Sequence, residues 1–134
     1  MPDAPRILEK TYLVTEREAI SFMGPGVVPV LSTPALLAWM ELTSRDNAGP
    51  LLAPGEDTVG VSVDMKHLAA TPVGMRVRIV SRLSAVEGRI YTFEIEAFDD
   101  LDKIGEARHQ RASVLVAKFA SRVEAKRAKS KTAD

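Results

Sequence analysis

The chain has 134 residues, no cysteine and a formal net charge of zero, with 46% hydrophobic and 27% charged residues. These values predict one globular domain, and they exclude a disulfide framework, a thiol nucleophile and a thiolate metal site. No apolar run approaches the roughly 18 residues that a membrane-spanning helix needs. The first residues also lack the basic and then apolar order of a signal peptide, so we expect a cytoplasmic protein.

The charges are unevenly distributed along the chain. Residues 118–134 contain six basic and two acidic groups, a net charge of +4, so residues 1–117 carry −4. This balance is not typical of a nucleic-acid-binding body, whose basic residues cluster on a folded face. We predict a domain at residues 1–120 and a basic tail at residues 121–134, as a frayed helix or a disordered end. A second interpretation places this tail near the phosphates of an anionic ligand.

The first third of the chain combines a strand, a loop and a helix. Loose alternation predicts a strand within residues 7–17. Residues 21–29 contain two prolines and two glycines among apolar residues, which predicts a loop that acts as a flap. Thr33 followed by Pro34 is typical of a helix start, with the threonine as N-cap and the proline at the first helical position. We expect this helix to end at about Asn47.

From residue 59 the hydrophobic pattern has a period of two, which predicts a meander of four strands. The last strand is expected from about Ile104 to Phe119 and is long enough to predict a bulge. In the first of these strands Gly60, Ser62, Asp64 and Lys66 are predicted to face away from the core. The predicted core-facing residues of the first three strands are Val59, Val61, Val63, Met65, Met75, Val77, Ile79, Leu83, Tyr91, Phe93, Ile95 and Ala97.

This order of elements predicts an α+β fold. A single long helix before an antiparallel sheet is best buried when the sheet curls around it, so we expect one central helix wrapped by a curved antiparallel sheet of about five strands. The helix is apolar on every side, whereas each strand has one apolar face, so one sheet cannot cover the helix. We infer that a second copy of the chain covers the rest, most simply in a two-fold dimer.

Glu41 interrupts this apolar helix, within a run from Thr33 to Leu42. A carboxylate in such a place must find a partner, shift its pKa or contact a water-filled cleft, which favours a functional site. The alternative is a surface ion pair with Arg45, which lies four residues later on the same helical face.

Other side chains are also suited to chemistry. His67 continues the core-facing side of its strand, either as a satisfied core histidine or as a catalytic residue opposite Glu41. Thr33 lies at a helix N-terminus, whose free N–H groups can stabilise an oxyanion. His109 and Arg111 share one face of the last strand, and taken alone they indicate a solvated edge.

The spacing of Thr33 and Glu41 bears on how a site could form. They are eight positions apart, which is about 12 Å along a helix, so one carbonyl group cannot easily reach both within a single chain. If the helices of a dimer are antiparallel, Glu41 of one meets Thr33 of the other. Two histidines without cysteines leave no set with metal-ligand geometry. Neither a phosphate-binding glycine-rich loop nor a G-x-S-x-G elbow occurs.

Several segments follow one another in the order of a known family. They are Ser32-Thr33, Trp39-Met40-Glu41, residues 52–56, residues 67–74, residues 84–89 and residues 104–112. The His-x-Ala-x-Thr-Pro-x-Gly pattern at residues 67–74 is the most specific of them. Over roughly residues 30–120 the chain resembles hotdog-fold acyl-CoA thioesterases, and most closely the fluoroacetyl-CoA thioesterase group.

The resemblance implies a hotdog fold with active sites at the interface of a homodimer or a higher oligomer. It implies that Thr33, Glu41 and His67 occupy the catalytic positions and that Gly60 and Arg111 bind substrate. The implied reaction is hydrolysis of a small or medium acyl-CoA thioester to the free acid and CoA. No metal, no cofactor besides the CoA of the substrate, and no nucleic-acid or membrane partner is expected.

The resemblance leaves the roles of the catalytic residues open. Glu41 acts either as a nucleophile that forms a mixed anhydride or as a base that activates water. Thr33 either attacks or orients the carbonyl group, and His67 acts as a base or a proton donor. Two rival functions on the same fold are a non-catalytic dimer that binds acyl-CoA or serves as an interaction module, and an acyl-thioester dehydratase or hydratase.

The flap departs from the pattern of the fluoroacetyl-CoA thioesterase group. That group carries phenylalanines in a lid just before the catalytic threonine, whereas this chain has Gly24 and Val27 there. Phe22 is the nearest aromatic residue. The departure bears on selectivity for a fluorinated acyl group and less on thioester hydrolysis.

Overall fold

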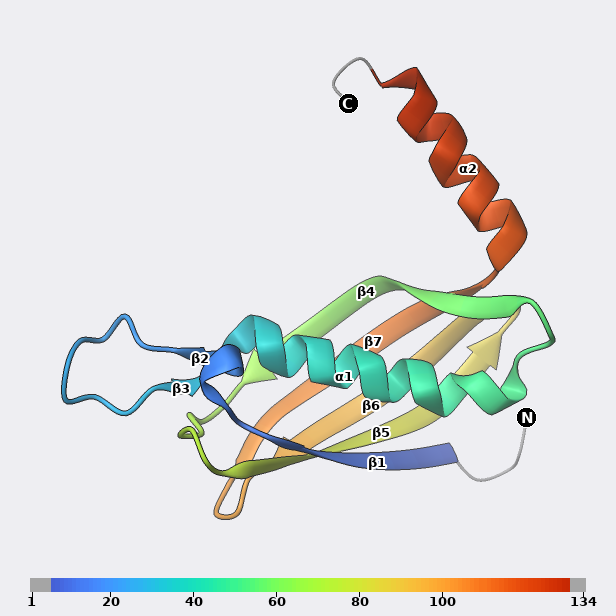
Figure 1. Ribbon diagram of the computed structural model, residues 1–134. Helices are drawn as coiled ribbons and strands as arrows, with labels where there is room; N and C mark the ends of the chain where they lie inside the picture. Colours follow the sequence, from blue (N-terminus) through green and yellow to red (C-terminus); the bar gives the residue numbers. More distant parts are fainter. Residues whose placement is uncertain (1–5, 131–134) are drawn as a thin grey trace.

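The structure, a computed structural model that describes residues 6–130, has one helix lying across a curved five-stranded antiparallel sheet (Figure 1). The strand order in the sheet is β1-β5-β6-β7-β4, so β1 and β4 form its two edges. A separate two-stranded ribbon joins β2 and β3. The elements are β1 (Arg6–Leu13), a 3₁₀ turn (Glu16–Glu18), β2 (Ala19–Ile20), β3 (Val30–Leu31), α1 (Thr33–Ala48), a second 3₁₀ turn (Gly49–Leu51), β4 (Glu56–His67), β5 (Arg76–Glu87), β6 (Ile90–Phe98), β7 (Lys103–Leu115) and α2 (Val116–Lys129).

The central helix α1 buries one side against the sheet. Gly105 of β7 permits this close packing, because a Cβ atom there would lie 3.0 Å from Cδ2 of Leu36 and 3.3 Å from Cε of Met40. The opposite side of α1, which includes Leu42, is exposed, in agreement with the inference that one sheet cannot cover this helix. The buried residues recur every three or four positions and are Leu36, Trp39, Met40, Thr43, Ser44, Asn47 and Ala48.

The N-cap of α1 is Ser32 and not Thr33, so the predicted cap is wrong by one residue. The Oγ atom of Ser32 accepts a hydrogen bond from the N–H of Ala35 at 3.2 Å. Thr33 is the first helical residue and Pro34 the second, a position that proline tolerates because its N–H would have no intrahelical partner. The shift leaves the Thr33 side chain available for contacts outside the helix.

A β-bulge in β4, between Gly60 and Ser62, reverses which residues of the strand face α1. Even-numbered residues face the helix before the bulge and odd-numbered residues face it afterwards, because the bulge adds one residue to the strand. The predictions that Val59 and Val61 face the core and that Gly60 faces away are therefore wrong, and Val61, at the bulge, is exposed. The predicted face is confirmed after the bulge, for Val63, Met65 and His67.

The first and the last strand are shorter at their C-terminal ends than predicted, while the two strands β5 and β6 agree with the prediction. The first strand ends at Leu13, and the last ends at Leu115 because residues 116–129 form α2 instead of continuing it. This segment is rich in Ala, Lys and Arg, which favour helix. The predicted boundary at residue 121 falls inside α2, so the division into domain and tail stays a prediction, and residues 131–134 lie outside the described residues.

Within residues 6–130 no helix is long and apolar enough to cross a membrane.

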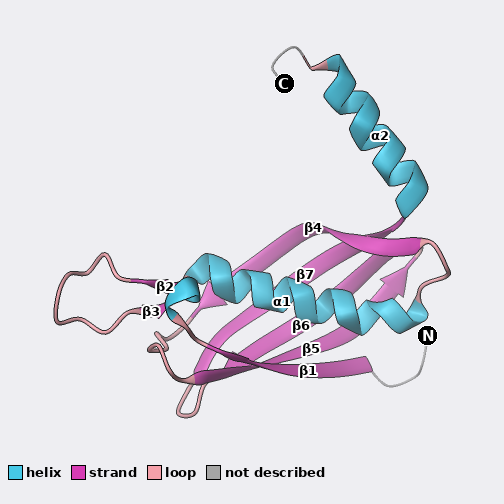
Figure 2. Cartoon of the chain, in the orientation of Figure 1, coloured by secondary structure: helices cyan, strands magenta, loops and turns pink. Residues whose placement is uncertain are grey.

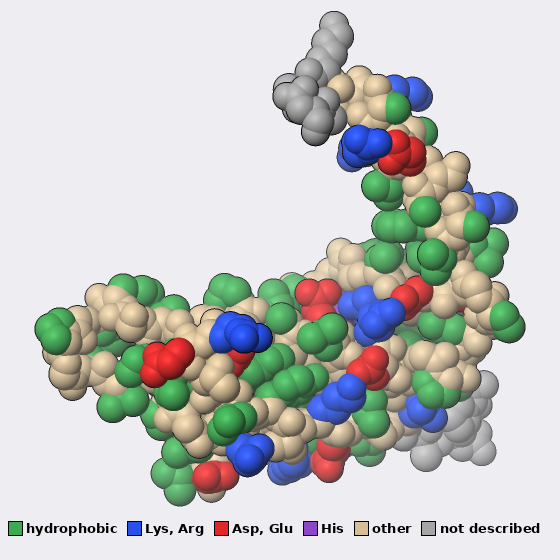
Figure 3. Space-filling model, in the orientation of Figure 1, with side chains coloured by type: hydrophobic (Ala, Val, Ile, Leu, Met, Phe, Trp, Pro, Cys, Tyr) green, Lys and Arg blue, Asp and Glu red, His purple; other side chains and the backbone are tan. Residues whose placement is uncertain are grey.

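The loop at residues 21–29 connects β2 with β3 and extends beyond the N-terminal end of α1 (Figure 2). Gly24 and Gly26 have positive φ angles of 104° and 85°, which non-glycine residues rarely adopt. Hydrophobic side chains gather along this loop (Figure 3). Those that are exposed are Phe22, Met23, Val27 and Val28. The loop thus has the apolar surface expected of a flap.

The N-cap assignment predicts how two neighbouring substitutions affect stability. Ser32→Ala should lower the free energy of unfolding by about 1 kcal/mol, because the N–H of Ala35 loses its acceptor. Thr33→Ala keeps the cap and should change the free energy by less than about 0.5 kcal/mol. Urea unfolding at one fixed protein concentration measures both values. An equal loss in the two variants would contradict Ser32 as the N-cap.

Candidate active site

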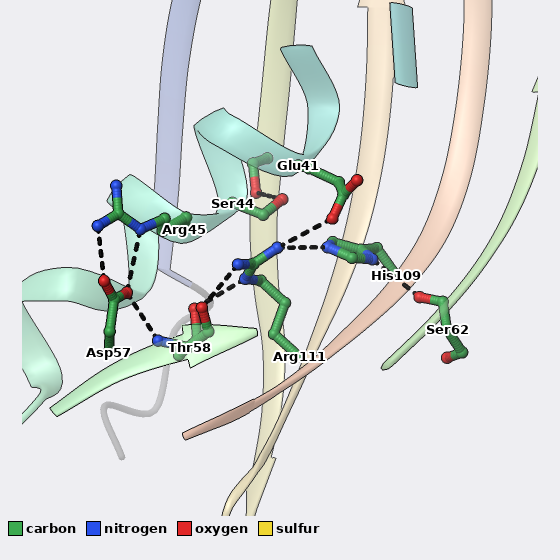
Figure 4. A network of polar contacts seen from close by, with 9 residues as sticks. Glu41, Ser44, Arg45, Asp57, Thr58, Ser62, His109 and Arg111 are labelled. Carbon is green, nitrogen blue, oxygen red and sulfur yellow. Dashed lines mark hydrogen bonds and ion pairs between the residues drawn. The ribbon is translucent and has the colours of Figure 1, made fainter. Parts of the chain in front are cut away.

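Glu41 forms an ion pair with a buried arginine. Its Oε2 atom lies 3.3 Å from Nη1 of Arg111, which reaches the helix from β7 (Figure 4). The side chain of Arg111 is 6% exposed and that of Glu41 is 42% exposed. Burial lowers the pKa of the Arg111 guanidinium, and the neighbouring Glu41 opposes that shift. The carboxylate therefore lies at the surface above a buried positive charge, with Oε1 left free of this ion pair.

The alternative pair of Glu41 with Arg45 does not form. Arg45 donates instead to both carboxylate oxygens of Asp57, at 3.0 and 2.6 Å. A surface ion pair with Arg45 therefore does not explain Glu41, and its assignment to a functional site stays a prediction.

Further hydrogen bonds fix the guanidinium of Arg111 in position. Nε donates to Oγ1 of Thr58 at 2.7 Å, and Nη2 donates to the carbonyl oxygen of the same residue at 2.8 Å. Nη1 lies 3.2 Å from Nε2 of His109, whose Nδ1 lies 2.8 Å from the carbonyl oxygen of Ser62. Because a carbonyl oxygen only accepts, Nδ1 of His109 donates and Nε2 accepts from Arg111.

His109 is held in its neutral form by its surroundings. Burial lowers its pKa, the carbonyl of Ser62 opposes that shift, and the charge of Arg111 adds to it. The solvated edge predicted for His109 and Arg111 is therefore wrong, since both are buried and face α1. Gly105 and Ala107 have the same parity on this strand, and these small uncharged residues were the sequence signal for a core-facing side.

Gly60 of β4 lies directly below the carboxylate of Glu41. A Cβ atom at this position would lie 2.7 Å from Oε2 of Glu41 and 3.4 Å from Cε1 of His109. A side chain there would push the carboxylate away from its present place. The absence of a side chain at residue 60 is therefore a geometric condition of the contact between Glu41 and Arg111.

Thr33 and His67 form a second group, at the N-terminal end of α1. Oγ1 of Thr33 lies 2.8 Å from Nδ1 of His67. Burial lowers the pKa of His67, with the carbonyl of Ala69 opposing the shift, so the neutral imidazole predominates at pH 7. Nε2 of His67 is buried, with no hydrogen-bond partner among the described residues. The pair borders an open cavity of about 340 Å³, together with Ile20, Val30, Leu31, Leu68, Ala69 and Ala70.

The N-terminus of α1 has fewer free donors than the sequence suggested. The N–H of Ala35 is taken by the side chain of Ser32, and the N–H of Leu36 donates to the Ser32 carbonyl at 3.1 Å. Pro34 has no N–H. In the described part of the chain, only the N–H of Thr33 is left free in the first turn of α1. The expectation that several free N–H groups of this turn could bind an oxyanion is therefore wrong.

The five predicted site residues thus form two separate groups. Glu41 lies with Gly60 and Arg111, and Thr33 lies with His67. Along α1 the two groups are about 12 Å apart. His109 belongs to the first group, although the sequence did not single it out as a site residue. Among residues 6–130 no three His, Asp or Glu side chains are placed to hold a metal ion.

Comparisons with known proteins give this arrangement a context. The profile of the family described as "Fluoroacetyl-CoA-specific thioesterase" matches residues 14–117. A fluoroacetyl-CoA thioesterase from Streptantibioticus cattleyicolor is 35% identical over 97 residues, which cover 72% of this chain and 70% of that protein. The chain belongs to the fluoroacetyl-CoA-specific thioesterase family. The predicted class of enzyme, a thioester hydrolase, is thereby confirmed.

Solved structures confirm the predicted hotdog fold. A structure of a fluoroacetyl-CoA thioesterase superposes with a TM-score of 0.85 at 27% identity, over 94% of this chain and 98% of that one. A Thermus thermophilus protein described as a thioesterase superfamily member superposes with a TM-score of 0.78 at 32% identity, over 92% and 90% of the two chains. A hot-dog-like protein from Thermanaerovibrio acidaminovorans has a TM-score of 0.83 at 19% identity, over 92% of each chain, and supports the fold alone.

The contact at Gly60 predicts the effect of one added methyl group. Gly60→Ala should lower kcat for thioester hydrolysis by about 100-fold, because the added methyl group would lie 2.7 Å from Oε2 of Glu41 and would push the carboxylate out of position. Steady-state kinetics with thiol detection measures this change, and thermal unfolding checks that the variant is folded. Gly49→Ala is the matched control, since a Cβ there meets nothing within 4 Å. A folded Gly60→Ala enzyme with wild-type kcat would contradict this account of the glycine.

Proposed function

We propose that the protein hydrolyses a small or medium acyl-CoA thioester to the free acid and CoA, at active sites that two copies of the chain form together. The observation that carries this proposal is the half-exposed carboxylate of Glu41 above the buried Arg111. The ion pair with Arg111 uses only Oε2, so charge balance alone does not account for the second carboxylate oxygen, which is left at the surface. A hydrolase needs such a group next to the thioester carbonyl.

The exposed edge of the sheet supports the participation of a second copy. β4 is an edge strand of 12 residues, and its Val61 and Val63 are 54% and 40% exposed. Leu42 of α1 is exposed as well. A long edge strand with exposed apolar side chains is prone to pair with another strand, and a two-fold dimer is the most common arrangement that covers it.

Pairing of β4 with its own copy also accounts for the two separate groups of site residues. In an antiparallel pair whose two-fold axis passes between Val63 and Asp64, His67 lies opposite Gly60 of the partner subunit. The two α1 helices then run antiparallel. This arrangement brings the group of Thr33 and His67 toward the Glu41 group of the other chain, so one thioester contacts both.

Each group has a distinct part in the proposed reaction. The N–H and the hydroxyl of Thr33 donate hydrogen bonds to the thioester carbonyl oxygen, and Nδ1 of His67 donates to Oγ1 of Thr33. Glu41 acts on the carbonyl carbon, either directly or through a water molecule. The C–S bond breaks, the oxygen of water ends in the carboxylic acid, and the released thiolate takes up a proton. Both routes require the carboxylate at the same place.

The size of the space that the flap at residues 21–29 and the partner chain enclose around the acyl group limits which acyl groups are accepted. The relative from Streptantibioticus cattleyicolor is named for fluoroacetyl-CoA, and the same substrate is one candidate here. The lid phenylalanines of the fluoroacetyl-CoA thioesterase group are replaced by Gly24 and Val27, so we propose unfluorinated small or medium acyl groups as the main substrates. The absence of a further cofactor and the cytoplasmic location stay predictions from the sequence.

Thiol release from a panel of acyl-CoA esters, including fluoroacetyl-CoA, tests the proposed activity. Glu41→Gln should lower kcat by about 1000-fold on the best substrate of the panel, because the amide is neither a base nor a nucleophile. Asp46→Asn removes a carboxylate from the same helix outside the site and serves as the control. A protein that binds acyl-CoA esters but releases no thiol from any of them would establish the non-catalytic rival instead.

A further inference from the structure

A groove of about 230 Å³ lies where α2 leaves the sheet. Its walls come from α2, the end of β7, the start of β4 and the hairpin between β5 and β6. The charged residues that line it are Arg89, Lys118, Arg122 and Glu56. We call this site the α2 groove. It lies outside both groups of catalytic candidates.

The cations of the α2 groove have no anionic partner in the part of the chain that the structure describes. Within residues 6–130 no carboxylate lies within ion-pair distance of Arg89, Lys118 or Arg122, whereas Arg127 of the same helix is paired with Glu124. Glu56, the one carboxylate that lines the groove, forms no ion pair with these cations, and its Oε1 accepts from the N–H of Ala53 at 2.8 Å.

Two of these cations are close neighbours on one helical face. Lys118 and Arg122 are one turn apart on α2, and this pairing of like charges costs free energy unless an anion relieves it. Basic side chains are visible along α2 in the space-filling view (Figure 3). Three unpaired cations that converge from a hairpin and a helix fit a ligand with more than one negative charge.

The groove also contains an exposed aromatic ring. Phe119, between Lys118 and Arg122 in the sequence, is 39% exposed and lines the same groove. An aromatic ring among cations stacks on a nucleobase while the cations bind the phosphates. This combination fits an adenosine phosphate better than inorganic phosphate.

The distance from the α2 groove to Glu41 fits the shape of the proposed substrate. Gly60, below Glu41, is four residues from Glu56 on β4, and Arg111 is four residues from Leu115 on β7. Measured along either strand, the groove therefore lies about 13 Å from the position of the Glu41 carboxylate. The extended pantetheine arm of CoA, which joins the thioester to the phosphates, is long enough for this span.

We propose that the α2 groove binds the 3′-phosphorylated ADP portion of the acyl-CoA substrate, with Arg89, Lys118 and Arg122 on its phosphates and Phe119 against its adenine. This proposal rests on the proposed thioesterase function and adds the site that recognises CoA as the carrier of the acyl group. α2 is then part of the substrate site, although it projects away from the sheet (Figure 1).

The test compares one acyl group on two carriers. Lys118→Gln combined with Arg122→Gln should raise KM for the acyl-CoA about 100-fold, because two charge-assisted contacts are lost. KM for the same acyl group on pantetheine, which lacks the phosphates and the adenosine, should stay close to the wild-type value. Lys126→Gln combined with Lys129→Gln is the control, with the same change of charge on the same helix outside the groove. An equal rise of KM for both carriers, no rise, or an equal effect of the control pair would overturn the proposal.

A direct binding measurement separates this proposal from the proposed function. Titration calorimetry with adenosine 3′,5′-bisphosphate should show binding to the wild-type protein and a loss of about 100-fold in affinity in the Lys118→Gln, Arg122→Gln variant. Unchanged affinity in that variant would overturn the groove assignment even if the enzyme hydrolyses acyl-CoA. Absence of thiol release from both carriers would instead count against the thioesterase function.

Discussion

The ion pair between Arg111 and Glu41 is the interaction on which the rest of the site depends. A buried guanidinium without a counter-charge is strongly unfavourable, so the chain must place a carboxylate next to it. That carboxylate comes from the helix, while the arginine comes from the strand beside the sheet edge. The pair therefore fixes the position of α1 relative to β7 and leaves one carboxylate oxygen outside the ion pair. Fold and site are held by the same contact.

Other features of the sheet serve this one contact. The bulge in β4 turns Gly60 toward the helix, where the missing side chain makes room for the carboxylate. The same bulge leaves odd-numbered residues facing the helix further along, so that His67 reaches Thr33. The bulge in β4 thus determines the positions of two candidate site residues, Gly60 and His67. His109 completes the arrangement by accepting from Arg111 and contributing no competing charge.

The sequence predicted those parts of the structure that depend on local patterns. The apolar run around Glu41 and the alternation after the bulge were sufficient to place the helix, the strands and His67. Three features were missed because they depend on contacts between distant segments. The bulge changes the parity of β4 without a strong signal, the pairing of Arg111 with Glu41 joins residues 70 positions apart, and burial of His109 requires β7 to be an inner strand. Gly60 and Arg111 were identified as site residues by family resemblance and not by their own pattern.

The central claim is that a complete active site combines Thr33 of one chain with Glu41 of another, and mixing one variant of each residue tests it directly. Thr33→Ala and Glu41→Gln chains are unfolded together in equal amounts, refolded and assayed for thiol release. In each mixed dimer one site contains both substitutions and the other contains neither. The account predicts recovery of about a quarter of the wild-type activity, since half of the dimers are mixed and each has one intact site. Activity no greater than the average of the two variants alone, from a mixture shown to contain mixed dimers, would contradict it.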